Sequence, residues 1–167
     1  MSTLLRSFAL SALHALVIAP FTIAQCTTFS PTAYSQVTAA GCGAPVLTVS
    51  NPPQFGVTTS LTASNLDFGP GFQVVVYAFK LPPNSGPAAW TTNVAGIPLV
   101  AGCFNHLPDA TIHIAELSFT GVTSVSINIP LSGFAVGSVI RAQAFQLDLA
   151  NFNLSAATNS VCLYLAP

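Results

Sequence analysis

Residues 123–129 read TSVSINI, and this stretch decides the fold class. Three apolar side chains alternate there with Ser, Ser and Asn, so an extended strand would have one apolar face and one polar face. Residues 57–64 (VTTSLTAS) alternate in a similar way. Such alternation is typical of antiparallel sheets that pack on one side and face water on the other.

Segments rich in Val, Ile, Thr, Phe and Leu continue in both directions from this stretch, with Pro and Gly between them. The run Val74–Tyr77 is apolar on both faces, as expected of a central strand. Beyond the N-terminus we find no sustained helical periodicity, although residues 104–116 leave room for a helical turn and 150–158 for a loop or a short helix. The expected strands are Pro45–Ser50, Val57–Ser64, Phe72–Lys80, Ile97–Cys103, Thr111–Phe119, Thr123–Ile129, Ser138–Asp148 and Ser160–Leu165. The sequence therefore predicts an all-β, antiparallel two-sheet sandwich of about eight strands, of Ig-like or Greek-key type.

The N-terminus has the pattern of an export signal. Arg6 supplies a positive charge, residues 8–18 are mostly apolar, and Pro20 precedes the small residues of a cleavage site after Ala24. The apolar stretch is shorter than the ~20 residues that a membrane-spanning helix needs. A lipid anchor on Cys26 is disfavoured because Gln, rather than a small residue, precedes it. We expect three parts: a signal peptide (1–24), an N-terminal arm (25–40) and a β-sandwich domain (41–167).

Charged side chains are scarce. Asp, Glu, Lys and Arg make up 4% of the chain, and the formal net charge is −1. Binding to nucleic acid depends on clustered Lys and Arg, and no basic patch exists here. Nucleic acid is therefore excluded as a partner, and no membrane span is expected once the signal is cleaved.

All four cysteines, Cys26, Cys42, Cys103 and Cys162, follow the predicted cleavage site. An even number of cysteines in an exported chain indicates disulfides rather than thiols. Their spacing contains no Cys-x-x-Cys pair of the kind that binds zinc. Two bridges are expected, and three connectivities remain open at this point.

Several short motifs resemble those of a family of small exported bacterial β-sandwich domains that have no established activity. The motifs are Gly41-Cys42-Gly43, Gly102-Cys103-Phe104, Val125–Pro130, Ala142-Gln143-Ala144 and Thr158-Asn159-Ser160. The resemblance covers about residues 41–165 and consists of turn and strand signatures. This chain lacks the family's richer Leu/Pro/Gly loops before the second cysteine. Residues 25–40 and Cys162 are additions to the pattern.

The resemblance also implies a disulfide pairing. The family's two recurrent cysteines match Cys42 and Cys103, which implies a Cys42–Cys103 bridge and, with it, Cys26–Cys162. The competing pairing joins Cys26 to Cys42 and Cys103 to Cys162.

The ionisable residues His106, Asp109, His113 and Glu116 form one cluster in the sequence. Imidazole and carboxylate groups that converge on one point can bind a metal or act as an acid and base. In a strand, however, His113 and Glu116 would lie on opposite faces. We therefore interpret the cluster as a polar loop that leads into a strand, with no catalytic, cofactor-binding or metal-binding role.

Other catalytic patterns are also missing from the sequence. It contains no Gly-x-Ser-x-Gly elbow for a nucleophilic serine and no glycine-rich phosphate loop. We expect a protein without enzymatic activity and without a cofactor.

The strongest ligand-contact candidate is Trp90, in the turn-rich segment 82–95, because aromatic rings can stack on sugars. The alternative is that Trp90 covers one end of the sandwich. Arg141 and Gln143 alternate with alanines on one strand, and we interpret them as a polar sheet face.

These observations predict a secreted structural or adhesive module of the cell surface or extracellular space. Low charge leaves sheet edges poorly protected, so self-association or binding to an envelope protein is expected. The alternative function is a module that binds glycans or other envelope polymers through exposed aromatics such as Trp90.

Overall fold

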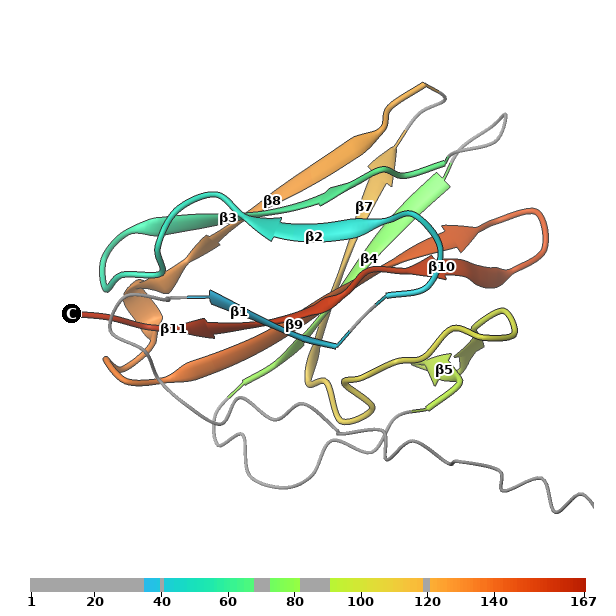
Figure 1. Cartoon of the computed structure of the whole chain (residues 1–167). Helices are drawn as coiled ribbons and strands as arrows, with labels where there is room; N and C mark the ends of the chain where they lie inside the picture. Colours follow the sequence, from blue (N-terminus) through green and yellow to red (C-terminus); the bar gives the residue numbers. More distant parts are fainter. Residues whose placement is uncertain (1–34, 40, 68–72, 82–90, 119–120) are drawn as a thin grey trace, which may run out of the picture.

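The computed structural model describes residues 35–39, 41–67, 73–81, 91–118 and 121–167. Within these ranges the chain forms eleven β-strands and one 3-10 turn, η1 (Leu131–Gly133), and contains no α-helix. The strands form antiparallel sheets that pack face to face (Figure 1). The predicted all-β sandwich is therefore confirmed, whereas its Ig-like type stays a prediction.

The smaller sheet has three strands in the order β2 (Val46–Val49), β3 (Thr58–Ser64) and β8 (Ser124–Pro130). Its side chains follow the predicted alternation, since Leu61 and Ile127 are buried and lie opposite each other in the β3–β8 ladder. Ser60, Thr62 and Ser126 face outward, whereas the hydroxyl-bearing Thr59 lies on the core face with Leu61 and is buried. Pro130 closes β8 because it has no N–H to donate to a ladder.

The larger sheet has the order β1, β11, β9, β4, β7, and a further strand, β10, pairs with β9. The strands are β1 (Ser35–Ala39), β4 (Gln73–Lys80), β7 (Ile112–Ser118), β9 (Val139–Asp148), β10 (Asn153–Ala157) and β11 (Ser160–Tyr164). The apolar strand β4 lies between β9 and β7, as its sequence predicted. In Figure 1, β2, β3 and β8 lie over β9 and β11.

The main core fills the space between the two sheets. Leu47 and Leu61 from the smaller sheet pack there with Val75, Ile140 and Leu163 from the larger one. Tyr77 crosses this core, and its hydroxyl donates a hydrogen bond to the Val125 carbonyl at 2.6 Å. One tyrosine thus links the centre of the larger sheet to β8.

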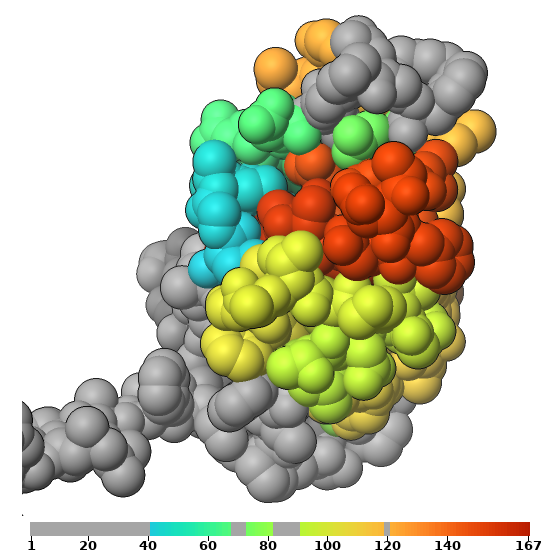
Figure 2. Space-filling view, turned by 90° about the vertical axis from the view of Figure 1, so that its right-hand side faces the viewer, coloured from blue at the N-terminus to red at the C-terminus, as the bar shows by residue number. Residues whose placement is uncertain are grey.

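The outer face of the larger sheet is covered as well, although not by a third large sheet. Residues 91–110 cross it, and they include the short ladder of β5 (Asn93–Val94) and β6 (Ile97–Pro98). Figure 2 shows the yellow part of this segment packed directly against the orange-red β9–β10 hairpin. The Val100 amide donates to the Leu154 carbonyl at 3.0 Å, and Val94 and Leu99 belong to a second apolar cluster with Phe145.

Four expectations about individual elements need correction or extension. The predicted strand Ile97–Cys103 is wrong beyond Pro98, because residues 99–103 turn across the outer face. Residues 153–157 form β10 rather than a loop or a short helix, and residues 104–111 contain no helical turn. Strand β1 falls within the predicted arm 25–40 and pairs with β11.

The predicted signal peptide lies outside the described residues. No helix long and apolar enough to cross a membrane occurs in the part of the chain that the structure describes.

Candidate functional site: a polar junction on the outer face

The polar side chains of the larger sheet gather on its outer face, beneath residues 104–109. Arg141 and Gln143 project from β9 on this face, while Ala142 and Ala144 face the main core. Arg141 is 5% exposed and Gln143 is 0% exposed. The prediction of a polar sheet face is right in placement, but the face is covered rather than hydrated.

Gln143 holds the covering segment through both ends of its amide. Its Oε1 accepts a hydrogen bond from the His106 backbone N–H at 2.8 Å. Its Nε2 donates to the carbonyls of Phe104 at 3.1 Å and Thr158 at 2.9 Å. One buried side chain thus satisfies backbone groups from two separate segments, which would otherwise be costly to bury.

Thr158 and Asn159 carry the same network across to the smaller sheet. The Ala144 amide donates to Thr158 Oγ1 at 2.9 Å. The Asn159 side chain accepts from the Leu47 amide at 2.8 Å and donates to the Leu47 carbonyl at 3.1 Å. An amide side chain therefore pairs with β2 in the manner of a strand, at the point where β10 turns into β11.

Gly41 and Cys42 close the junction on its other side. A Cβ atom on Gly41 would lie 2.4 Å from the Ala157 carbonyl oxygen and 2.5 Å from the Thr158 carbonyl carbon. Only glycine permits that backbone approach. Cys42 then donates its amide to the Ala157 carbonyl at 2.8 Å and forms a disulfide with Cys103. We define the junction as Gly41, Cys42, Cys103, Gln143, Thr158 and Asn159.

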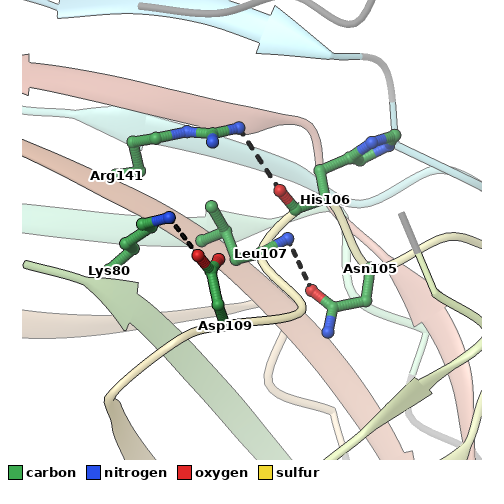
Figure 3. Close-up of polar contacts among 6 residues, drawn as sticks. All are labelled: Lys80, Asn105, His106, Leu107, Asp109 and Arg141. Atoms are coloured by element: carbon green, nitrogen blue, oxygen red, sulfur yellow. Dashed lines mark hydrogen bonds and ion pairs between the residues drawn. The ribbon is translucent and has the colours of Figure 1, made fainter. Parts of the chain in front are cut away.

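Two cations, Lys80 and Arg141, and one acid, Asp109, gather around residues 105–109 (Figure 3). Lys80 and Arg141 occupy opposite positions in the β4–β9 ladder, and both are nearly buried. Lys80 forms an ion pair with Asp109, whose side chain is half exposed. The hydrogen bond from Lys80 lowers the pKa of the Asp109 carboxyl below its usual value. Burial lowers the pKa of the Arg141 guanidinium, although the nearby Asp109 charge opposes this shift.

Arg141 also contacts the covering segment. Its Nη2 donates to the His106 carbonyl at 3.3 Å, while its buried Nε has no acceptor among the described residues. The Asn105 side-chain oxygen accepts a hydrogen bond from the Leu107 amide at 2.8 Å, which closes a tight turn in this segment. Segment 104–109 is thus held from below by Gln143 and Arg141 and from its end by Lys80.

The structure separates the four ionisable residues that are clustered in the sequence. The Asp109 carboxylate points toward Lys80, whereas the His106 imidazole points away from Asp109 (Figure 3). His113 and Glu116 lie on β7, opposite Ala78 and Val75, and therefore on different faces of the sheet. Within the described ranges, no three His, Cys, Asp or Glu residues are placed so as to hold a metal ion.

The Cys42–Cys103 pairing is confirmed, and the competing pairing through Cys26–Cys42 is excluded. Cys162 is also disulfide-bonded. Its predicted partner, Cys26, lies outside the described residues, as does Trp90, the predicted ligand contact.

Sequence reasoning missed the junction as a unit. It treated Gly41, the Cys103 motif, Gln143 and the Thr158–Ser160 motif as separate turn and strand signatures. The available signal was chemical: Gln143 is an amide between two alanines in an apolar strand, and such an amide needs partners when buried. Its partners were not identifiable, because they lie 15 to 39 residues away along the chain.

No protein-family model, no curated protein and no solved structure matches this chain. The resemblance to exported β-sandwich domains therefore stays a prediction. The geometry of the junction has a clear chemical meaning on its own. Its amides, hydroxyl and disulfide hold backbone segments together and join the two sheets to the outer cover.

Proposed function

We propose that this chain is a secreted, non-catalytic structural module of the cell surface or extracellular space, which works by adhesion. Two features of the described fold support this proposal. Residues from four of the sequence motifs meet at the junction, where they hold the covering segment and the two sheets together. The sheet opposite the junction presents a broad neutral face.

The main support for an adhesive role is the chemistry of the outer face formed by β2, β3 and β8. None of these three strands contains a charged residue. Thr62 and Ser126 share a hydrogen bond at 2.7 Å across the β3–β8 ladder, and Ser60 donates to Asn128 at 2.5 Å. Thr48 donates to the Thr62 carbonyl at 3.3 Å. The hydroxyls thus form rows across the three strands, each held by its neighbour.

A face of this kind makes contacts that depend little on salt or pH. Hydroxyl and amide groups do not titrate between pH 5 and 8, and their hydrogen bonds are not screened as ion pairs are. Successive rows lie about 7 Å apart along a strand, and the side chains within one row lie about 5 Å apart on neighbouring strands. Such a regular array of donors and acceptors suits adhesion to another hydroxyl-rich surface.

The test is to display the full chain on the surface of a host cell and to measure adhesion to hydroxyl-rich surfaces. We expect adhesion to change less than about twofold between 10 mM and 1 M salt, because the face is uncharged. The variant Thr62→Lys should reduce adhesion strongly, whereas Val136→Lys, at another exposed position, should not. Adhesion that disappears at high salt, or that ignores Thr62→Lys, would contradict the proposal.

A further inference from the structure

Strand β7 (Ile112–Ser118) carries three large apolar side chains, yet these are packed against little of the molecule. Ile112 is 40% exposed, Ile114 is 37% exposed and Leu117 is 69% exposed. The two isoleucines lie opposite Phe79 and Tyr77 in the β4–β7 ladder, and Leu117 lies opposite Val74. Apolar side chains are therefore exposed on both faces of this strand. In the described part of the chain, neither apolar cluster includes a β7 residue.

The backbone of β7 is open as well. This strand is the last of the larger sheet, and among the described strands it pairs with β4 alone. Unpaired N–H and C=O groups along an edge are a template for another strand. The usual protection by Lys, Pro or a bulge is missing from β7, whose residues are IHIAELS and whose ladder with β4 is regular.

The other edges of the two sheets are less suited to pairing. β2 has four residues, and β1 and β10 are each interrupted by a register shift, in β1 between Val37 and Ala39. β8 has seven residues, but it ends at Pro130, and its outward side chains bond within their own sheet. β7 is the edge that combines length, regularity and exposed apolar side chains.

We propose that β7 pairs antiparallel with β7 of a second copy of this chain, so that two larger sheets become one continuous sheet. This inference deepens the proposed structural function, because it names the partner through which copies assemble. A second copy fits because its β7 offers the same unpaired backbone and the same apolar side chains. The signal-cleaved chain keeps two cations and four acids, and its net charge of 2 − 4 = −2 gives little repulsion between copies.

A register centred on Ile114 is compatible with the charges on β7. Antiparallel pairing keeps residues of one face together, so a two-fold axis at Ile114 places the two Ile114 side chains opposite each other. Glu116, the only acid on β7, then lies opposite Ile112 of the second copy. The two Glu116 carboxylates are separated by about four residues along the strand, or roughly 13 Å. This register buries isoleucine without setting like charges opposite each other.

The size of the contact predicts its strength. A seven-residue ladder is about 24 Å long and one strand wide, which is less area than the ~1,600 Å² of a standard stable interface. We therefore expect reversible dimers that form at micromolar to millimolar concentrations. Contact between many copies at a surface would strengthen such weak pairing.

The experiment uses the oxidised, signal-cleaved chain between about 5 µM and about 500 µM, a range that brackets weak dimerisation. Sedimentation velocity measures the dimer fraction, and hydrogen exchange measures protection of each strand. We expect dimers at the higher concentration, with at least threefold slower exchange in β7 and no change in β8. Ile114→Lys should be monomeric throughout, because it introduces a charge at the two-fold axis. Val136→Lys, which adds the same charge to an exposed loop, should dimerise like the original chain.

A second edge variant, Ala115→Lys, controls for a folding defect in Ile114→Lys. A chain that is monomeric at every concentration, or dimers whose protection lies elsewhere and that survive both edge variants, would overturn the β7 assignment. The adhesion assay is run on the same variants. Adhesion by a monomeric chain would leave the proposed function standing without β7 pairing. Dimers that protect β7 but show no adhesion would support β7 pairing and contradict the proposed adhesive function.

Discussion

Apart from the edge strand β7, the two faces of the larger sheet are both buried, but different interactions cover them. The inner face meets another sheet, so Leu61, Val75 and Leu163 are covered by apolar side chains over a wide area. The outer face meets residues 91–110, whose own pairing consists of a two-residue ladder and one isolated bridge between Thr91 and Asn105. An irregular segment has backbone groups that a sheet would satisfy internally, and here Gln143 and Arg141 satisfy several of them. Covering a sheet with a loop therefore demands specific polar partners and a covalent bond, where covering it with a sheet demands mainly area.

The largest expected effect comes from removing the covalent bond of the outer cover. The double variant Cys42→Ser/Cys103→Ser opens a loop with a sequence separation of 61. In the chain-entropy model such a bridge stabilises by about 4 kcal/mol, so urea unfolding should show a loss of that order. Hydrogen exchange should increase in residues 91–110 much more than in β3 or β8. Equal increases on both faces would show that the two covers are not independent.

A smaller effect is expected from Gln143→Leu, which keeps the side-chain size but removes the amide. Three hydrogen bonds are lost, and buried backbone groups of Phe104, His106 and Thr158 are left without this partner. We expect a loss of about 3 kcal/mol in the free energy of unfolding, since each unsatisfied buried group costs about 1–3 kcal/mol.

Gln146→Leu is the matched control, since Gln146 is a nearly buried glutamine on the same strand that donates to the Asp67 carbonyl rather than to the outer cover. Limited proteolysis should cleave residues 104–109 faster in the Gln143 variant than in the control. Similar cleavage of both variants would contradict the role of Gln143 as the support of this segment.

On the inner face, Tyr77→Phe removes the polar link between the sheets, and we expect a loss of about 1–2 kcal/mol at neutral pH. Burial raises the pKa of Tyr77 from 10.0 to about 12. The folded state therefore holds the phenolic proton more tightly than the unfolded state. The stability that the protonated Tyr77 side chain contributes is fully present below pH 10. As the pH rises from 10 toward 12, the free energy of unfolding falls by about 1.4 kcal/mol per pH unit.

Thermal unfolding at pH 9 and pH 11 measures the difference. The original chain should lose more stability over this interval than the Tyr77→Phe variant. The same loss in both proteins would assign the alkaline sensitivity to other groups.

The sequence predicted β2, β3, β4, β7, β8, β9 and β11 to within about two residues at their described ends, because period-two alternation and proline punctuation are local signals. It failed at residues 99–103 and at β10. Residues 99–103 resemble a strand in sequence because Leu99 packs on the outer face of the larger sheet. Strand β10 is rich in small residues and is extended because it pairs with β9. Neither partner is visible in a local pattern.

The candidate site divides in the same way. The sequence drew attention to Gln143, Cys42 and Cys103 because of their residue types, and a family resemblance implied the Cys42–Cys103 pairing. The role of Lys80 was missed, because a lysine at the end of an apolar strand normally reaches solvent, whereas here Asp109 approaches it from the covering segment.

By itself, the sequence determined an oxidised, nearly uncharged sheet protein, because alternation, cysteine number and scarce charge are properties of residue types and their order. Only the tertiary structure decided that Gly41, Cys103, Gln143 and Asn159 form one junction, and that the outer face is covered while β7 stays exposed. Those outcomes depend on which distant segments lie side by side, and the contact between Asn159 and Leu47 spans 112 residues of chain.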